Sequence, residues 1–207
     1  MNLNFSNTLY SLVLFFLFVS FYEPKFKKLN NTILSNNEHI VSNDENPSFK
    51  NFVFLKNDFN GFKELLAFKE SGGRYFCTNK YGFMGKYQFN LSTLKMFNVR
   101  NAKLFLNSPE LQEKVFLLNV QRNKWILRKD IKWFVGSFIN GSKITESGIL
   151  AAAHLAGPGN VKKYLRGGGK DNSKDILGTS ISYYMDYFRN YDLSFVKKIK
   201  NPKVYSD

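Results

Sequence analysis

The strongest candidate for chemistry in this sequence is a single carboxylate, Glu70, at the end of an apolar stretch. Glycines, amides and aromatic residues follow it in the run ESGGRYFCTNKYGFMGKYQF. The next aspartate or glutamate after Glu70 is Glu110. Apolar surroundings raise the pKa of a carboxyl group and keep it protonated near neutral pH. Glu70 therefore has the profile of a general acid, one suited to protonating the bridging oxygen between two sugars.

The element that precedes Glu70 must position it, and the sequence predicts a helix there. Apolar residues between positions 59 and 66 recur at helical spacing, and Gly72 and Gly73 end the helix just beyond Glu70. The carboxylate then lies in the last turn, with one side against the core. Burial and the negative end of the helix dipole are both expected to raise its pKa.

The rest of the chain from residue 58 predicts a mainly α fold with a minor β element. The segment 74–89 lacks helical periodicity, which favours a loop with a short β-hairpin. Four further helices are expected: a long one capped by Ser108 and Pro109, one capped by Thr145 that ends at Gly157-Pro158-Gly159, and two short ones over 160–165 and 180–191. The long helix is expected to face the core with Leu111, Val115, Leu118 and Trp125.

The N-terminal region contains an uncharged run of 14 residues, 9–22 (LYSLVLFFLFVSFY). This run is too short to span a bilayer comfortably and has the length of the apolar part of an export signal. No lysine or arginine precedes it and no small-residue cleavage site follows it, so a buried helix stays as the alternative. We expect 1–23 to be a signal peptide or membrane anchor, 24–57 a polar spacer, and 58–207 the folded domain.

The composition limits the partners and cofactors of the chain. Its formal net charge of +14 favours an anionic partner such as nucleic acid, an acidic membrane or an acidic wall polymer, although the abundance of lysine can equally reflect overall composition. The lysines are scattered without a recognition motif, so nucleic acid is not expected. Cys77 is the only cysteine, and the two histidines, His39 and His154, lie far apart in the sequence. No disulfide, metal site or cofactor is therefore expected.

Three sequence elements, taken in order, resemble the soluble lytic transglycosylase family and its goose-type lysozyme relatives. The first is the pair Glu70-Ser71. The second is GKYQF, in which Gln88 lies eighteen residues after Glu70, and the third is AAHLAGPGNVKKYL. Their order and spacing match the family's pattern of Glu-Ser, Gly-x-x-Gln and Ala-Tyr-Asn-Ala-Gly-x-Gly.

The third element departs from the family at two positions. His154 stands where the family has tyrosine, and Leu155 stands where it has asparagine. Further on, GTSISYYMDYF resembles the family's final helix, which contains a tyrosine at the position of Tyr183 or Tyr184. The likeness covers roughly residues 58–190.

The resemblance implies a lysozyme-like helical domain that acts on peptidoglycan as a monomer, with Glu70 as the catalytic acid. No second carboxylate occurs within the 39 residues after Glu70, where goose-type lysozymes usually keep theirs. The more distant carboxylates are expected to be helix-start or surface charges, and they are Glu110, Glu113, Glu146, Asp171 and Asp175. The resemblance therefore favours transglycosylase chemistry, in which the N-acetyl group of muramic acid assists and the product ends in 1,6-anhydromuramic acid.

Two alternatives stay open beside the transglycosylase, namely a hydrolytic muramidase of the same fold and a non-catalytic module that binds the cell wall. Each of the three functions fits an exported bacterial protein, whether periplasmic, membrane-anchored or secreted.

The remaining candidate residues would bind the glycan. Gln88 and Asn79 can both donate and accept hydrogen bonds, as sugar hydroxyl and acetamido groups require, although Asn79 also suits an ordinary turn. Ser71 is expected to contact either the backbone near Glu70 or the substrate. His154 must be neutral, because a charged imidazole would hold Glu70 ionised, and a purely structural histidine is the alternative.

The other candidates for substrate contact are Tyr81, Met84, Tyr87, Gly157, Tyr183 and Tyr184. For the aromatic residues and the methionine of the segment after Glu70, the alternative is packing in the core. For Gly157 the alternative is a tight backbone path that only a glycine follows easily.

Overall fold

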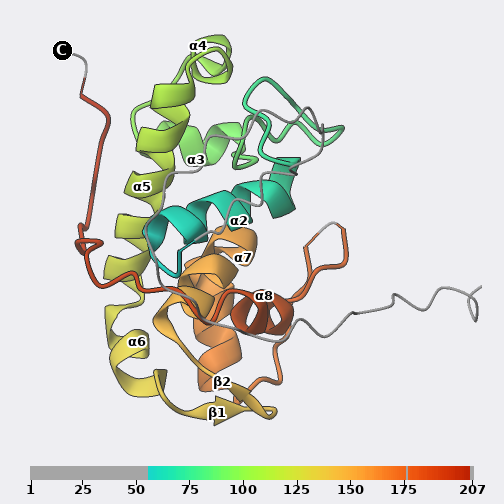
Figure 1. Ribbon diagram of the computed structural model, residues 1–207, viewed down its shortest axis with the longest axis vertical. Coiled ribbons are helices and arrows are strands. Elements are labelled where there is room, and N and C mark those ends of the chain that lie inside the picture. Colours follow the sequence, from blue (N-terminus) through green and yellow to red (C-terminus); the bar gives the residue numbers. More distant parts are fainter. Residues whose placement is uncertain (1–55, 176, 206–207) are drawn as a thin grey trace, which may run out of the picture. The chain divides into compact units, whose positions relative to one another are not determined.

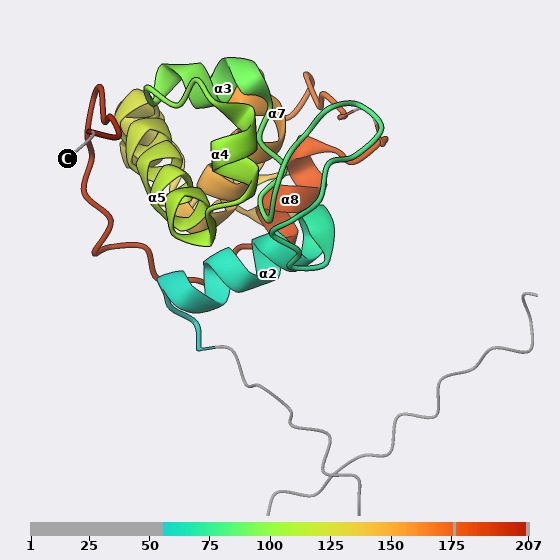
Figure 2. The ribbon, with the colours of Figure 1, turned by 90° about the horizontal axis from the view of Figure 1, so that it is seen from above.

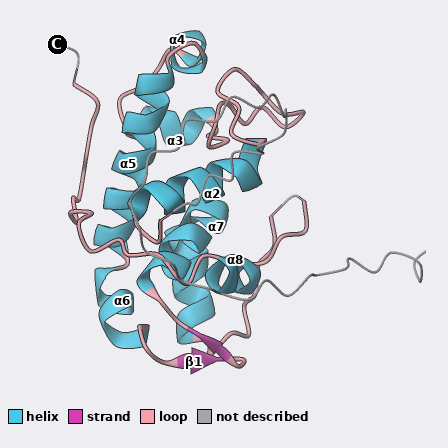
Figure 3. Cartoon of the chain, viewed as in Figure 1, coloured by secondary structure: helices cyan, strands magenta, loops and turns pink. Residues whose placement is uncertain are grey.

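The computed structural model describes residues 56–175 and 177–205, and these residues form a mainly helical structure with one small sheet (Figure 1 and Figure 3). The predicted export segment and nearly all of the predicted spacer fall before residue 56, outside the described residues. Within the described part, none of the helices combines the length and the apolar character needed to cross a bilayer. The expected fold class, mainly α with a minor β element, is confirmed.

The helices of the described residues are α2 (Phe59–Ser71), α3 (Leu91–Met96), α4 (Ala102–Leu106), α5 (Pro109–Ile126), α6 (Arg128–Phe134), α7 (Glu146–Arg166) and α8 (Ile181–Tyr187). Helix α7 packs against α5, α6 and α8, and α5 also contacts α4 and α6. The sequence pattern does not predict α3, α4 or α6, because each is too short to show a repeated apolar face.

Helix α2, which contains Glu70, begins and ends where the sequence predicts. The side chain of Asp58 caps its first turn by accepting hydrogen bonds from the backbone N–H groups of Asn60 and Gly61. Gly72 ends the helix in the left-handed conformation, at φ 69°, which a glycine adopts without steric cost. Glu70 therefore lies in the last turn, as expected.

The predicted starts of three other helices are confirmed. Ser108 accepts a hydrogen bond from the backbone N–H of Leu111 at the start of α5, and Thr145 caps α7 in the same way. Ser180 caps α8, which ends at Tyr187, earlier than the sequence predicts.

Helix α7 does not end at Gly157-Pro158-Gly159, so that prediction is wrong. Gly157 has non-helical backbone angles (φ 78°, ψ 153°), and the helix resumes after it and continues to Arg166. Pro158 has no N–H to donate and its ring fixes φ near the helical value, so it fits the first turn of the second half. The short helix predicted over 160–165 is this second half of α7.

The β element lies in a different place from the one predicted. Residues 74–89 form a loop with isolated bridges, in which Met84 pairs with Thr78 and with Phe89. The two-stranded antiparallel sheet consists of β1 (Phe138–Ile139) and β2 (Ser142–Lys143), joined through Asn140 and Gly141 at positive φ. Asn-Gly between two short extended segments is a strong hairpin signal, and it marks this turn in the sequence.

The core between α2, α5, α7 and α8 is rich in aromatic rings. Phe62 of α2 lies against Phe116 of α5 and against Phe188, which directly follows α8, with ring centroids 6.3 and 5.7 Å apart. All three rings are buried. Burial of each such side chain contributes roughly 2–3 kcal/mol to stability.

Helix α5 buries more polar side chains than its apolar pattern predicts. Of the residues expected to face inward, Val115 is buried, whereas the other three are half-buried: Leu111, Leu118 and Trp125. Helix α5 also carries buried polar side chains, and they are Gln112, Asn119, Asn123 and Lys124. The C-terminal segment runs along α5 (Figure 2), where the N–H of Ile199 donates to the carbonyl of Gln121.

Gln112 ties the loop after α2 to the rest of the fold. Its Oε1 accepts a hydrogen bond of 2.8 Å from the backbone N–H of Lys86. Its Nε2 donates to the carbonyls of Tyr75, Phe105 and Leu106, each at 3.2 Å. The side chain is fully buried, so water cannot reach it. These bonds therefore supply the only hydrogen-bond partners that the Gln112 amide has in the described structure.

We predict that Gln112→Leu lowers the free energy of unfolding by about 3 kcal/mol, because it leaves buried backbone groups without partners. Urea denaturation at constant pH measures this loss. Lys114→Ala on the exposed side of the same helix is the control, with an expected change within about 0.5 kcal/mol. Equal stability of Gln112→Leu and the wild type would show that Gln112 does not hold the loop.

Candidate active site

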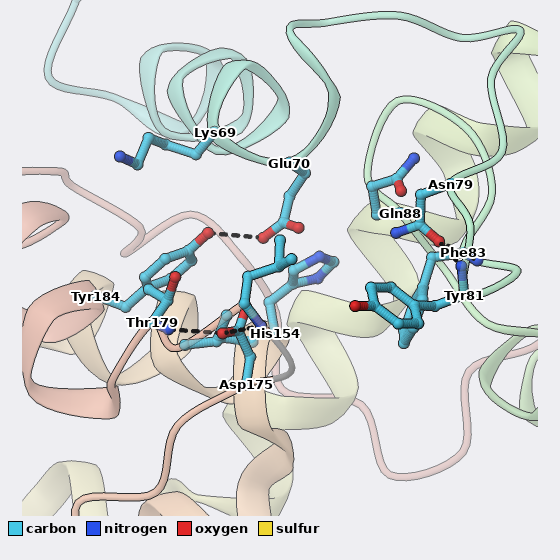
Figure 4. Close-up of a pocket in the computed structure, with 12 residues that line it drawn as sticks. Lys69, Glu70, Asn79, Tyr81, Phe83, Gln88, His154, Asp175, Thr179 and Tyr184 are labelled. Carbon is cyan, nitrogen blue, oxygen red and sulfur yellow. Dashed lines mark hydrogen bonds between the residues drawn. The ribbon is translucent and has the colours of Figure 1, made fainter. Parts of the chain in front are cut away.

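The residue singled out first in the sequence, Glu70, lines a pocket of about 210 Å³ (Figure 4). The pocket is formed by the end of α2, the loop after it, the middle of α7, the segment that leads into α8, and α8 itself. Its lining residues are Lys69, Glu70, Asn79, Tyr81, Phe83, Gln88, His154, Leu155, Asp175, Leu177, Thr179 and Tyr184. Each of the three sequence elements of the family resemblance contributes to this lining: the first through Glu70, the second through Gln88, and the third through His154 and Leu155.

Glu70 points from the last turn of α2 into the pocket, where Tyr184 of α8 meets it. The Tyr184 hydroxyl donates a hydrogen bond of 2.8 Å to Glu70 Oε1. Burial raises the pKa of Glu70 from 4.5 to about 7; the Tyr184 bond opposes this rise, the negative charge of Asp175 adds to it, and Lys69 opposes it weakly. Near neutral pH, Glu70 is therefore present both as an acid and as a carboxylate.

His154 lines the pocket, but protein groups hold both of its ring nitrogens. Nε2 lies 2.9 Å from the carbonyl of Tyr87, which can only accept, so Nε2 bears the proton. Nδ1 then accepts from the amide of Asn119 at 3.2 Å. Burial lowers the pKa of His154 to about 4, against an opposing effect of the bond to Tyr87, and the imidazole is neutral as expected.

The structural alternative for His154 is therefore the one that the structure favours. In the described residues no hydrogen bond joins His154 to Glu70, and Tyr184 makes the contact with the carboxylate instead. The imidazole also packs edge-on against Phe89 and Phe116, with ring centroids 5.2 and 5.8 Å away.

Gln88 and Asn79 lie on the opposite side of the pocket from Lys69 (Figure 4). Gln88 has a left-handed backbone, at φ 49°, and its amide donates to the carbonyl of Gly85 at 2.9 Å. The Asn79 side-chain oxygen accepts from the backbone N–H groups of Tyr81 and Phe83, at 2.9 and 3.1 Å. Asn79 is thus both a turn residue and a pocket residue, so the two expectations for it hold together.

Five predicted substrate contacts do not line the pocket, and four of them serve the backbone or the core. Ser71 is buried and serves the backbone, since its hydroxyl donates to the carbonyl of Lys86 at 2.8 Å. Met84 and Tyr87 are buried in the core, because burial of their apolar surface is more favourable than exposure to water. Gly157 forms the kink of α7.

Tyr183 also lies outside the pocket wall, on the exposed side of α8 next to Lys69. The ammonium of Lys69 donates a hydrogen bond of 3.0 Å to its hydroxyl. Of the two tyrosines that the family resemblance marks, the structure therefore joins Tyr184 to Glu70 and leaves Tyr183 at the edge of the site.

Glu113 is not the surface charge that the sequence suggests. Its carboxylate accepts hydrogen bonds from Lys63, Lys86, Tyr75 and Tyr87, all between 2.7 and 2.9 Å. Burial raises its pKa, but the four donors outweigh this effect and lower the pKa to about 2. This cluster fixes the loop after α2 to α5 and keeps Glu113 ionised near neutral pH.

Asp175 is also not a simple surface charge, because it lines the pocket beside Glu70. Its Oδ1 accepts from the backbone N–H groups of Leu177 and Thr179, at 3.0 and 2.6 Å. The sequence contains no signal that this loop returns to Glu70, since the two acids are more than a hundred residues apart. Leu177 and Thr179 are missed for the same reason, whereas Lys69 is missed although it directly precedes Glu70, because an exposed lysine on a helix usually lies on its solvated face.

The pocket offers no metal centre of the usual kind. Across residues 56–175 and 177–205, no three side chains of histidine, cysteine, aspartate or glutamate are grouped closely enough to hold a metal ion.

No family model, curated protein or solved structure matches this chain.

We predict that Tyr184→Phe raises the pKa of Glu70 above its present value of about 7, because it removes the hydrogen bond that favours the carboxylate. The pKa is measured by following the carboxyl carbon of Glu70 by ¹³C NMR as pH changes. Tyr187→Phe removes a hydroxyl from the same helix and should leave the titration unchanged. An unchanged pKa in Tyr184→Phe would mean that this bond does not control Glu70.

The raised pKa of Glu70 also predicts how stability depends on pH. The folded protein holds its proton up to about pH 7, whereas the unfolded chain releases it near pH 4.5. The stabilisation is thus complete below pH 4.5 and is lost as pH rises through 7, by on the order of 3 kcal/mol. Glu70→Gln cannot ionise, so its stability relative to the wild type should increase between pH 5 and pH 8.5.

Chemical denaturation of both proteins at the two pH values tests this prediction. All other titrating groups are shared and cancel in the comparison. Parallel stability curves for the two proteins would show that Glu70 titrates like a solvated carboxyl.

Proposed function

We propose that this protein is a lytic transglycosylase with a lysozyme-like fold that cleaves the β-1,4 bond between N-acetylmuramic acid and N-acetylglucosamine in peptidoglycan. The observation that carries the proposal is Glu70, a buried carboxyl group whose pKa of about 7 lets it give and take a proton at neutral pH. The proposal places the protein outside the cytoplasm, where its substrate is.

The proposed reaction uses Glu70 twice. The acid form protonates the bridging oxygen, and the bond to the anomeric carbon breaks as the carbonyl oxygen of the N-acetyl group attacks that carbon. The Glu70 carboxylate then accepts the proton of the 6-hydroxyl of the same muramic acid. The 6-oxygen displaces the acetamido oxygen, which leaves a 1,6-anhydro ring and restores the acid with no water consumed.

The surroundings of Glu70 support this role. Tyr184 donates to the carboxylate and steadies it at the moment when it must act as a base. His154 stays neutral, so no nearby imidazolium holds Glu70 ionised. Asn79, Gln88 and the ring of Tyr81 line the same pocket and offer the amide and aromatic surfaces that bind sugars.

A hydrolytic muramidase is the second candidate, and the position of Asp175 favours it. A second carboxylate in the pocket could activate a water molecule or stabilise the positive charge on the sugar. The hydrolase adds one water per bond and leaves a reducing end, whereas the transglycosylase leaves an anhydro end.

We predict that Glu70→Gln reduces the release of glycan from purified sacculi at least about a thousandfold, because an amide cannot donate the proton that the leaving oxygen needs. Mass spectrometry of the wild-type products should show anhydro ends, lighter by one water than reducing ends. The fold of the variant is checked by its thermal denaturation. If the wild type and Glu70→Gln release glycan at the same rate, Glu70 is not the catalytic acid.

Asp175→Asn separates the two candidates, since asparagine keeps the oxygen that accepts from Leu177 and Thr179. A transglycosylase should retain its anhydro products and its rate within about tenfold, whereas a muramidase that depends on Asp175 should lose reducing-end products. A wild-type protein that binds sacculi and never releases glycan would instead indicate a non-catalytic wall-binding module.

A further inference from the structure

A cationic and aromatic surface lies directly beside the pocket, on the side of Glu70 away from Gln88. Tyr183 and Tyr187 lie one turn apart on α8 and stack with ring centroids 5.6 Å apart and planes inclined by 22°. The Lys69 ammonium lies 5.1 Å from the centroid of the Tyr183 ring and 4.8 Å from that of the Tyr187 ring. Figure 4 shows the Lys69 side chain leaving α2 on this side.

These three side chains are exposed although two of them are large aromatic residues. Tyr183 and Tyr187 are 44% and 42% exposed. Aromatic rings at the surface next to a pocket are a common means of binding the apolar face of a ligand. Their position continues the pocket beyond Glu70, because Lys69 itself is one of the pocket residues.

The ammonium of Lys69 is available for an anionic ligand. Between residues 56 and 205, with position 176 excepted, no carboxylate forms an ion pair with it, and its hydrogen-bond partner is the neutral hydroxyl of Tyr183. The adjacent Glu70 points into the pocket toward Tyr184 instead. An ammonium over aromatic faces retains two further protons that can bind a carboxylate.

We infer that Lys69, Tyr183 and Tyr187 form a subsite that binds a sugar bearing a carboxylate, with the ring on the tyrosines and the carboxylate on the ammonium. This inference rests on the proposed function and specifies its substrate. In peptidoglycan the carboxylate has two sources, the acidic stem peptide and, where the stem has been removed, the lactyl group of muramic acid. A neutral polymer of N-acetylglucosamine lacks both.

Binding is best measured in the Glu70→Gln background, for two reasons. Cleavage of the ligand is prevented, and the effect of Lys69 on the ionisation of Glu70 is removed. Three oligosaccharides of equal length serve as probes: a chitin oligomer, a muramic-acid glycan without stems, and the same glycan with stems. Calorimetry gives the affinity for each.

Lys69→Met should lower the affinity for the carboxylate-bearing glycans about tenfold and change the affinity for the chitin oligomer less than twofold. A loss confined to the glycan with stems identifies the stem as the source, and a loss confined to the other glycan identifies the lactyl group. Tyr187→Leu should weaken all three ligands. Lys95→Met on the exposed side of α3 removes the same charge elsewhere and should change none of them.

Unchanged affinities in Lys69→Met, an equal loss for the neutral oligomer, or no binding of any probe would overturn the subsite. The proposed function is judged separately by whether the wild type releases glycan from sacculi. Release by the wild type with unchanged affinities in Lys69→Met overturns the subsite alone.

Discussion

The site depends on the balance of two effects at one carboxyl group. Burial removes Glu70 from water and favours its neutral form, whereas the hydroxyl of Tyr184 favours the ionised form. A solvated glutamate would be ionised at neutral pH and could not act as an acid. The same group buried without a donor would hold its proton too tightly to act as a base. The pKa of about 7 lies between these limits, and it requires that α2 end just beyond Glu70 and that α8 pack against that end.

The long helix α5 supports the pocket from behind without lining it. Gln112 holds the backbone of the loop after α2, Glu113 holds its lysine and tyrosine side chains, and Asn119 donates to Nδ1 of His154. These polar side chains are largely buried, and each forms hydrogen bonds with other protein groups. Together these bonds hold the loop 74–89 in one conformation. The loop can therefore present Asn79 and Gln88 to the pocket although it contains no regular strand.

Local signals in the sequence predict the parts of the fold that local chemistry determines. The caps Ser108 and Thr145 and the glycine after Ser71 mark helix ends through hydrogen bonds within a few residues, and all of these ends are correct. Glu70 is recognised as a pocket residue from its apolar surroundings, and Gln88 from the resemblance of the element that contains it.

The sequence fails where the position of a residue depends on distant segments. Nothing near Asp175 indicates that its loop returns to Glu70, and nothing near Glu113 indicates that two lysines and two tyrosines converge on it. The assignment of Met84 and Tyr87 to the substrate fails because an aromatic loop can turn its side chains into the core as easily as toward a ligand. The kink of α7 is missed because Gly-Pro-Gly ends a helix more often than it joins two.

The contact between α2 and α8 links the two halves of the site. Two consecutive residues of α2 meet two consecutive residues of α8: Lys69 donates to Tyr183 at 3.0 Å, and Tyr184 donates to Glu70 at 2.8 Å. Neighbouring positions on a helix point about 100° apart, so each pair faces a different side. One pair places the acid inside the pocket, and the other leaves an ammonium and a tyrosine at its edge. A shift of α8 by one residue would break both pairs at once, so the register of this contact controls the protonation of Glu70 together with the surface offered to the ligand.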